Sequence, residues 1–247
     1  MLNGVAETHF DEWIAQNYQT LWPELFDRDL VEATVEFLSD LAETGAALEF
    51  GIGTGRVALP LNRRGIQVHG IELSPAMLTQ LRAHDGASNI GLTLGDFATI
   101  GVDGTFAVVY LLRNAITNLT SQDEQVECFR NAAKHLRPGG TFVVENYVPE
   151  LRRIPPGEST HVFTATVTHI AVGEYDMVNQ TEISRHWWLI DGELKTFSSP
   201  HRYVWPAELD LMARLAGMKL RERWGGWRRE PFNAESRSHI SVWETSA

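Results

Sequence analysis

The chain has 247 residues, which suits one large domain or one domain with an insertion. Its formal charge of −11 argues against a nucleic-acid partner, whose phosphates require a surplus of Lys and Arg. A single cysteine, Cys128, excludes an intrachain disulfide framework, and no apolar run approaches the roughly 18 residues of a membrane span. The N-terminus lacks the basic-then-apolar order of a signal peptide, so we expect a cytoplasmic protein without a membrane partner.

Strands and helices alternate in the first 148 residues. The apolar periodicity and the turn residues predict helices and strands in chain order. Helices are predicted at 1–45, 56–64, 74–84 and 120–136, and strands at 47–56 (running into a glycine turn), 66–72, 89–97, 106–112 and 141–148. Several strands are apolar runs without clean alternation, which is typical of strands covered on both faces. The pattern therefore predicts an α/β fold with a doubly wound parallel sheet.

The pattern changes after Pro149. Residues 160–205 have period-two character and predict three long antiparallel strands, with turns at 173–175 and 191–192. A helix at 206–216 and strands at 218–226 and 238–244 follow. We therefore divide the chain into a first part of the core (1–148), an antiparallel β insertion that covers the site or makes a dimer contact (149–205), and the closing elements of the core (206–247). These strands offer an edge and a face through which a homodimer could form, although the sequence does not establish one.

A glycine turn joins the first strand to the next helix. Glycine lets the backbone approach a ligand closely, and a helix that begins after such a turn directs N–H groups at it. The glycines are Gly51, Gly53 and Gly55, and Arg56 stands where the dinucleotide fingerprint requires its third glycine. Glu49 beside the turn disfavours a phosphate and suits a cationic group of the ligand.

Two further acids follow the second and third strands. Glu72 ends the second strand, where a carboxylate can accept both hydroxyls of a ribose. Asp96 can accept from an exocyclic amine, and Phe97 supplies an apolar ring face, although Asp96 could also be a turn or cap residue. Sites for a ribose, an adenine and an aminoacyl ammonium, without a phosphate site, fit S-adenosylmethionine.

These pieces resemble the class I S-adenosylmethionine-dependent methyltransferases. The matching segments are 49–55, 71–78, 95–97 and 135–140, in the family's order and spacing. The resemblance implies a seven-stranded Rossmann-like sheet of order 3-2-1-4-5-7-6 and an N-terminal segment folded over the cofactor, with Tyr18 and Trp22 as aromatic candidates if they are not core residues. The expected cofactor residues are Glu49, Gly51, Gly53, Gly55, Arg56, Glu72, Leu73, Asp96, Phe97, Tyr18 and Trp22; Arg56 could equally be a solvated side chain at the start of a helix.

No dedicated acceptor motif is present. Residues 112–118 after the fourth strand lack the Asn/Asp-Pro-Pro-aromatic sequence of amino-methylating DNA and protein-glutamine enzymes, and no His/Cys metal spacing is found. The acceptor should lie over the carboxyl ends of the strands. The candidates are Asn114 and His186 as catalytic residues, and Arg113, Asn118, Asn146, Tyr147 and Trp188 as substrate residues.

The insertion carries four histidines, at positions 161, 169, 186 and 201. One of them could act as a base, because histidine titrates near neutrality, although the stronger interpretation for any single one is a surface or hydrogen-bonded sheet residue. His186 and Trp188 share a strand face by period two, and Trp187 points the other way.

We therefore expect an enzyme that transfers a methyl group from S-adenosylmethionine to a nitrogen or oxygen of a small molecule and leaves S-adenosylhomocysteine. The position of the insertion is similar to that in N-methyltransferases of amino sugars and related natural products. Three alternatives remain open: carbon methylation, a non-catalytic S-adenosylmethionine-binding protein, and a nicotinamide-dependent oxidoreductase.

Overall fold

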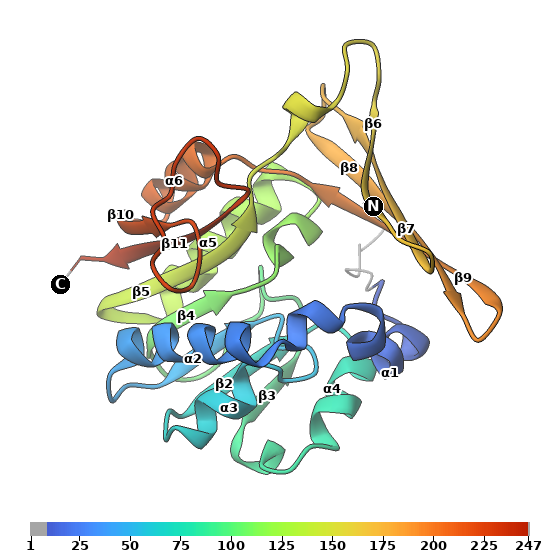
Figure 1. Cartoon of the computed structure of the whole chain (residues 1–247). Coiled ribbons are helices and arrows are strands. Elements are labelled where there is room, and N and C mark those ends of the chain that lie inside the picture. Colours follow the sequence, from blue (N-terminus) through green and yellow to red (C-terminus); the bar gives the residue numbers. More distant parts are fainter. Residues whose placement is uncertain (1–8, 247) are drawn as a thin grey trace, which may run out of the picture.

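The computed structural model describes residues 9–246, which form a seven-stranded sheet flanked by helices and a separate four-stranded sheet (Figure 1). The α-helices are α1 (Glu12–Leu21), α2 (Arg28–Ala42), α3 (Ala58–Arg63), α4 (Pro75–Arg82), α5 (Gln122–His135) and α6 (Pro206–Leu215). Short 3₁₀ turns are η1 (Pro23–Phe26), η2 (Ala87–Asn89), η3 (Ala115–Asn118) and η4 (Leu151–Arg153). None of the helices within this range combines the length and apolar character that a membrane crossing requires.

The seven-stranded sheet has the order β10-β11-β5-β4-β1-β2-β3. Its strands are β1 (Ala47–Phe50), β2 (Val68–Glu72), β3 (Gly91–Leu94), β4 (Phe106–Leu111), β5 (Leu136–Tyr147), β10 (Met218–Trp224) and β11 (Ser238–Thr245). Neighbours from β3 to β5 pair in parallel, and β11 is antiparallel to both β5 and β10. The predicted order 3-2-1-4-5-7-6 is confirmed, because β10 and β11 are the sixth and seventh strands of this sheet.

Helices cover both faces of the sheet, as its apolar strands predict. Apolar side chains of α2, α3 and α4 pack on one face, and those of α5 and α6 pack on the other. Neighbouring residues of β4 divide between the two layers: Val108 and Tyr110 face the first, and Val109 and Leu111 face the second. The strand order reverses beside β1, and this arrangement opens a crevice at the carboxyl ends of β1 and β4.

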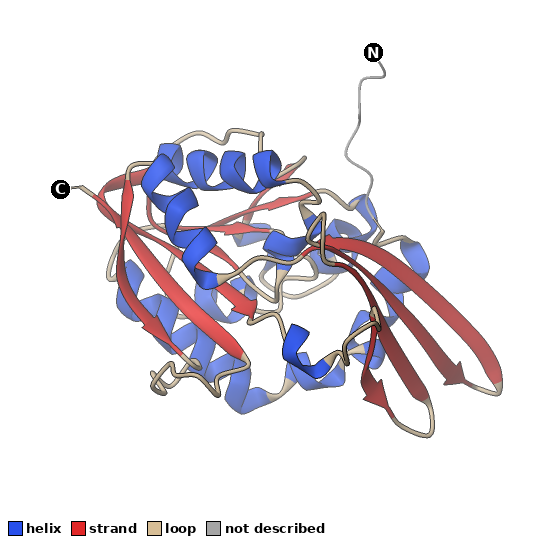
Figure 2. Cartoon of the chain, turned by 90° about the horizontal axis from the view of Figure 1, so that it is seen from above, coloured by secondary structure: helices blue, strands red, loops and turns tan. Residues whose placement is uncertain are grey.

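The insertion forms the four-stranded antiparallel sheet, which extends to one side of the core (Figure 2). Its strands are β6 (Thr160–Ala165), β7 (His169–Asp176), β8 (Thr181–Ile190) and β9 (Glu193–Arg202). The prediction of three strands with a turn at 173–175 is wrong, because the chain turns at 166–168 and 177–180 instead. Gly173 lies inside β7, where a Cβ would collide with the side chains of Glu182 and Tyr175. The glycine is thus a packing residue, whereas the turn at Asp191 and Gly192 is confirmed by their positive φ angles.

One face of the insertion packs over α1, and the other is turned outward. Trp188 of β8 is buried against Ile14 and Leu21, and partly buried aromatic rings surround this cluster. The outward face keeps several exposed apolar side chains: Val162, Ile170, Ile183, Leu189 and Leu194. A homodimer through this region stays a prediction.

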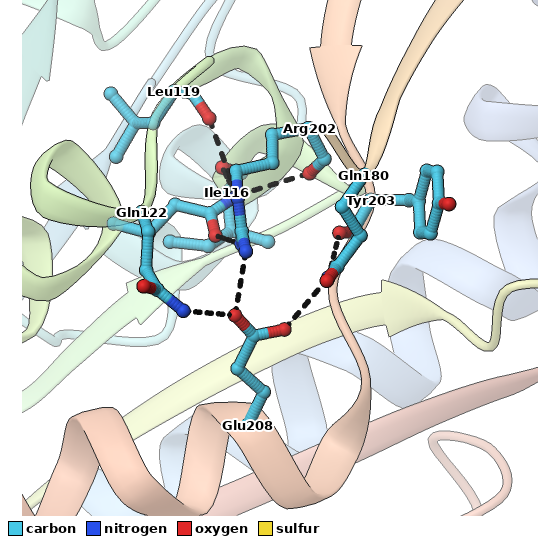
Figure 3. Close-up of polar contacts among 8 residues, drawn as sticks. Ile116, Leu119, Gln122, Gln180, Arg202, Tyr203 and Glu208 are labelled. Atoms are coloured by element: carbon cyan, nitrogen blue, oxygen red, sulfur yellow. Dashed lines mark hydrogen bonds and ion pairs between the residues drawn. The ribbon is translucent and has the colours of Figure 1, made fainter. Parts of the chain in front are cut away.

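A polar network fixes the last strand of the insertion to the core (Figure 3). The Arg202 guanidinium at the end of β9 donates to Gln125 of α5 at 2.6 Å and to Glu208 of α6 at 2.7 Å. Gln122 and Gln180 donate to the same Glu208 carboxylate at 2.7 and 2.8 Å. Because Arg202 is buried and bonded to both α5 and α6, this network holds the insertion at a defined position over the sheet.

Candidate functional site

A cavity of about 390 Å³ opens at the carboxyl ends of β1, β2, β3 and β4, within the size range of small-molecule sites. Most of the cofactor residues expected from the sequence line it. These are Glu49, Gly51, Gly53, Arg56, Glu72, Leu73, Asp96, Phe97 and Tyr18. Arg113 in the turn after β4 and Asn118 at the end of η3 close the cavity on the side of the insertion.

The glycine turn after β1 leaves open the space that a ligand would occupy. Gly51 and Gly53 have φ angles of 67° and 56°, a region that side chains rarely adopt. A Cβ added to Gly51 would lie 3.8 Å from the Phe97 ring and would fill the gap between the turn and that ring. Gly55 does not line the cavity: a Cβ there would press on Leu59 and Leu81, so this glycine allows close helix packing.

A glycine on the neighbouring strand β2, Gly70, also helps to position the turn. A Cβ at Gly70 would collide with the side chain of Ile52, which is buried on top of it. The backbone N–H groups of Gly51 and Ile52 both donate to the Ile71 carbonyl, at 2.8 and 3.1 Å. These contacts fix the conformation of the turn against β2 without a ligand. Such preorganisation favours tight binding.

Glu72 at the end of β2 is oriented by backbone donors. Its Oε2 accepts from Gly53 N at 2.8 Å, and its Oε1 accepts from Ser74 N at 2.9 Å. Burial raises the pKa of Glu72, while these N–H bonds act in the opposite direction. Each oxygen keeps a lone pair, so the carboxylate can still accept the two hydroxyls of a ribose.

Glu49 at the end of β1 is 5% exposed and accepts from the Tyr110 hydroxyl at 3.0 Å. Burial raises the pKa of Glu49 to about 8, and the nearby Arg56 partly opposes this. A ligand ammonium would replace the lost solvation and favour the ionised carboxylate, so the site suits the aminoacyl end of S-adenosylmethionine.

Arg56 and Tyr18 close the cavity from the N-terminal side. Arg56 Nη1 donates to the Leu25 carbonyl at 3.0 Å, which ties η1 to the glycine turn while the residue also lines the cavity. The Tyr18 ring contacts the rings of Trp22 and Phe26, at centroid distances of 5.1 and 6.1 Å. Arg56 is thus both a structural contact and a cation available to a ligand carboxylate.

The turn after β3 offers the groups that an adenine needs. Asp96 Oδ1 accepts from Ala98 N at 2.8 Å, and the carboxylate also lines the cavity. The Phe97 ring stacks on Phe50 at a centroid distance of 5.8 Å. Asn131 of α5 donates to the Phe97 carbonyl at 2.8 Å and fixes the turn from behind.

A second cavity of about 830 Å³, which we call the acceptor chamber, lies between the inner face of the insertion, η1 and the end of β5. Phe10, Tyr18, Arg113 and Asn118 line both cavities, so these residues form the boundary between them. Trp22, Asn114, Tyr147, His186 and Trp188 line the chamber only.

The boundary includes a strained turn. Arg113 and Asn114 both have positive φ angles, 52° and 59°, which are uncommon for residues other than glycine. Glu145 of β5 holds this turn by accepting from Arg113 N at 2.8 Å and from the Trp227 indole at 3.1 Å. The Asn114 side chain accepts from Tyr147 N at 2.8 Å, so Asn114 links the turn to the end of β5.

All four histidines predicted in the insertion line the chamber, and burial lowers the pKa of three of them, His169, His186 and His201. His186 Nδ1 lies 3.0 Å from His169 Nε2, and its Nε2 lies 2.9 Å from the Ser184 hydroxyl. Burial lowers the pKa of His186 to about 4, and His169 adds to this effect. Burial also lowers the pKa of His201 to about 4; its ring contacts Ser199 and Thr117.

The structure separates some residues that the sequence grouped together. Trp22 was expected at the cofactor, but it contacts Trp188 and Phe197 in the chamber, at centroid distances of 5.5 and 6.2 Å. Asn146 is fully buried and lines neither cavity, because its side chain points into the core while that of Tyr147 faces the chamber. Sequence reasoning missed Glu182, although it shares the period-two face of His186 and Trp188.

Comparison with known proteins agrees with this geometry. Residues 47–140 match the model of a methyltransferase domain. The CcbJ methyltransferase from Streptomyces caelestis is 36% identical with a TM-score of 0.86, over 97% of this chain and 99% of that one. The cypemycin N-terminal methyltransferase from a Streptomyces species is 27% identical over 90% of this chain and 98% of its own length. The fold is also that of CalS10, an amino pentose methyltransferase from Micromonospora echinaspora whose structure was solved with S-adenosylmethionine bound. That protein is 20% identical with a TM-score of 0.68, over 93% of this chain and 96% of that one.

The sheet order, the glycine turn with its three acids and the long match to a solved methyltransferase lead to one conclusion. This chain belongs to the class I S-adenosylmethionine-dependent methyltransferases.

Proposed function

We propose that this methyltransferase methylates an amine nitrogen of a small natural-product molecule. The acceptor chamber supports this proposal, because it adjoins the cofactor cavity through shared lining residues and has a volume suited to a small molecule. When bound, S-adenosylmethionine supplies a methyl group on a sulfonium centre. The residues of the chain bind the two reactants, align them and keep water away.

Two buried histidines of the chamber favour nitrogen over oxygen as the acceptor atom. His186 and His201, the histidines held neutral in the chamber wall, have pKa values lowered to about 4. Such weak bases do not ionise an alcohol, whereas an amine that has lost its proton to solvent has the lone pair that attacks.

The relatives support the same choice. The cypemycin N-terminal methyltransferase is named for transfer to a terminal amine, and it aligns along most of this chain. Methylation of a hydroxyl is the second candidate, because His161 and Glu182 also line the chamber and could accept a hydroxyl proton.

Matched acceptors test the proposal. The enzyme is incubated with S-adenosylmethionine and pairs of compounds that differ only in an amine or a hydroxyl, drawn from amino sugars and peptides with a free N-terminus. We expect S-adenosylhomocysteine and one added methyl group, measured by mass spectrometry, with amine members only. Methylation confined to the hydroxyl members would overturn the choice of nitrogen.

A further inference from the structure

The acceptor chamber contains a buried carboxylate that the proposed methyl transfer does not use. Glu182 of β8 is 6% exposed and lines the chamber. Its Oε2 accepts from the Tyr147 hydroxyl at 3.1 Å, and the Tyr175 hydroxyl also donates to it. We call these three residues the Glu182 cluster; they come from β5, β7 and β8 and thus from both sheets.

Glu182 differs from the other carboxylates of the chamber in having no cationic partner. Glu24 pairs with Arg113 at 3.4 Å. Glu150 pairs with Arg153 at 3.1 Å and approaches Arg237 at 3.7 Å. Within residues 9–246, Glu182 forms no salt bridge, and its hydrogen bonds come from two neutral phenols.

The histidine opposite Glu182 does not supply the missing charge. His201 is its register partner on β9, and burial lowers the pKa of that imidazole to about 4. Burying a carboxylate without a cation costs free energy unless a ligand or a proton compensates. Burial accordingly raises the pKa of Glu182.

The backbone makes room for this cluster. Tyr175 is the register partner of Glu182 across β7 and β8. A side chain at Gly173, two residues earlier on the same face, would collide with both Glu182 and Tyr175. Gly173 therefore lets the carboxylate and the phenol ring lie side by side, even though a glycine inside a strand weakens it.

We infer that the Glu182 cluster is a subsite that anchors a cationic nitrogen of the acceptor. An ammonium group has the N–H donors that the carboxylate lacks, and the faces of the two tyrosine rings also attract a cation. None of the three residues lines the cofactor cavity, so the anchored nitrogen lies away from the position that receives the methyl group. The inference rests on the proposed function only for the statement that the occupant is the acceptor.

Binding of a simple probe pair tests the subsite without turnover. Benzylammonium and its uncharged analogue benzyl alcohol are titrated by calorimetry at pH 7 into the protein saturated with S-adenosylhomocysteine. We expect the wild type to prefer the cation, and Glu182→Gln to weaken benzylammonium by roughly tenfold to a hundredfold while leaving benzyl alcohol unchanged. The matched control is Glu174→Gln, because Glu174 is an exposed carboxylate of β7 that pairs with Arg185 outside the chamber.

Each result has a defined meaning. A preference for the cation that Glu182→Gln abolishes and Glu174→Gln preserves supports the subsite. No preference in the wild type, or the same preference in Glu182→Gln, overturns it. If Glu182→Gln folds poorly, Tyr175→Phe gives a second test, with the cation expected to bind more weakly and benzyl alcohol unaffected. Because no methyl transfer is measured, failure to methylate amines would count against the proposed function alone.

Discussion

The cofactor cavity and the acceptor chamber are built in different ways. The cavity is made from segments that follow β1, β2, β3 and β4, where the sheet brings the carboxyl ends of its strands together. The chamber is assembled from both sheets and from the N-terminal turns, and its polar groups come from strand faces of the insertion as well as from turns. In our proposal, the carboxyl ends of the sheet strands bind the cofactor, and the position of the insertion over the sheet determines which acceptor fits.

The largest expected effect concerns the cofactor cavity. Gly53→Arg should abolish binding of S-adenosylhomocysteine in calorimetry, because the side chain enters space next to the Glu72 carboxylate. Gly65→Arg is the matched control: it has the same positive-φ requirement, with φ 89°, but lies at the end of α3 with nothing within 4 Å of an added Cβ. Retained tight binding in Gly53→Arg would contradict the assignment of the glycine turn.

The next largest effect is expected on stability, from the Arg202 network that holds the insertion on the core. Arg202→Met leaves Glu208 and Gln125 without their buried cation, and we expect a loss of about 3–5 kcal/mol in the free energy of unfolding. Denaturant titration measures this. Arg185→Met, which breaks the exposed pair with Glu174, should cost under about 1 kcal/mol. Equal losses in the two variants would show that the network does not anchor the insertion.

Gly70→Ala tests the support beneath the glycine turn. The added methyl group collides with Ile52, and we expect a destabilisation of about 1–3 kcal/mol together with weaker binding of S-adenosylhomocysteine. Gly101→Ala, where an added Cβ meets nothing within 4 Å, should leave both the melting temperature and the affinity nearly unchanged. A melting temperature in Gly70→Ala equal to that of the wild type would show that the turn does not depend on this contact.

The stability of the ligand-free protein should depend on pH through Glu49. Its pKa is raised from 4.5 to about 8 in the folded state, so between these values the folded protein holds one proton more than the unfolded chain. The free energy of unfolding therefore falls as pH rises through this window, by up to about 1.4 kcal/mol per pH unit from this group. Denaturant titrations at pH 6 and pH 8 should show a smaller fall in Glu49→Gln, and an identical fall would rule out Glu49 as its source.

Much of the fold and of the cofactor cavity could be predicted from the sequence, because their signals are local. Glycine turns, strand-end acids and the Ser74–Pro75 helix start occupy fixed places relative to the strands, and Ser74 does cap α4. The chamber could not be predicted in the same way. Gly173 suggests a turn in the sequence, but the packing of Glu182 from the neighbouring strand β8 makes it a strand residue.

The placement of Trp22 has a similar cause. Pro23 begins η1 directly after it, and the change of direction at this point turns the Trp22 ring toward the insertion rather than the cofactor cavity. No local pattern reports contacts between segments about 165 residues apart, such as Trp22 with Trp188. The only sequence signal for the chamber was the period-two alternation of side chains along β8. This alternation places Glu182, Ser184, His186 and Trp188 on one face of the strand.

Calorimetric titration of S-adenosylhomocysteine into Glu72→Ala and Glu182→Gln tests the division between the two regions most directly. Glu72→Ala removes the strand-end carboxylate of the cofactor cavity and should weaken binding by about 1–3 kcal/mol. Glu182→Gln changes only the chamber and should bind S-adenosylhomocysteine as tightly as the wild type. Unchanged affinity in Glu72→Ala, or an equal loss in Glu182→Gln, would contradict the separation of cofactor and acceptor sites.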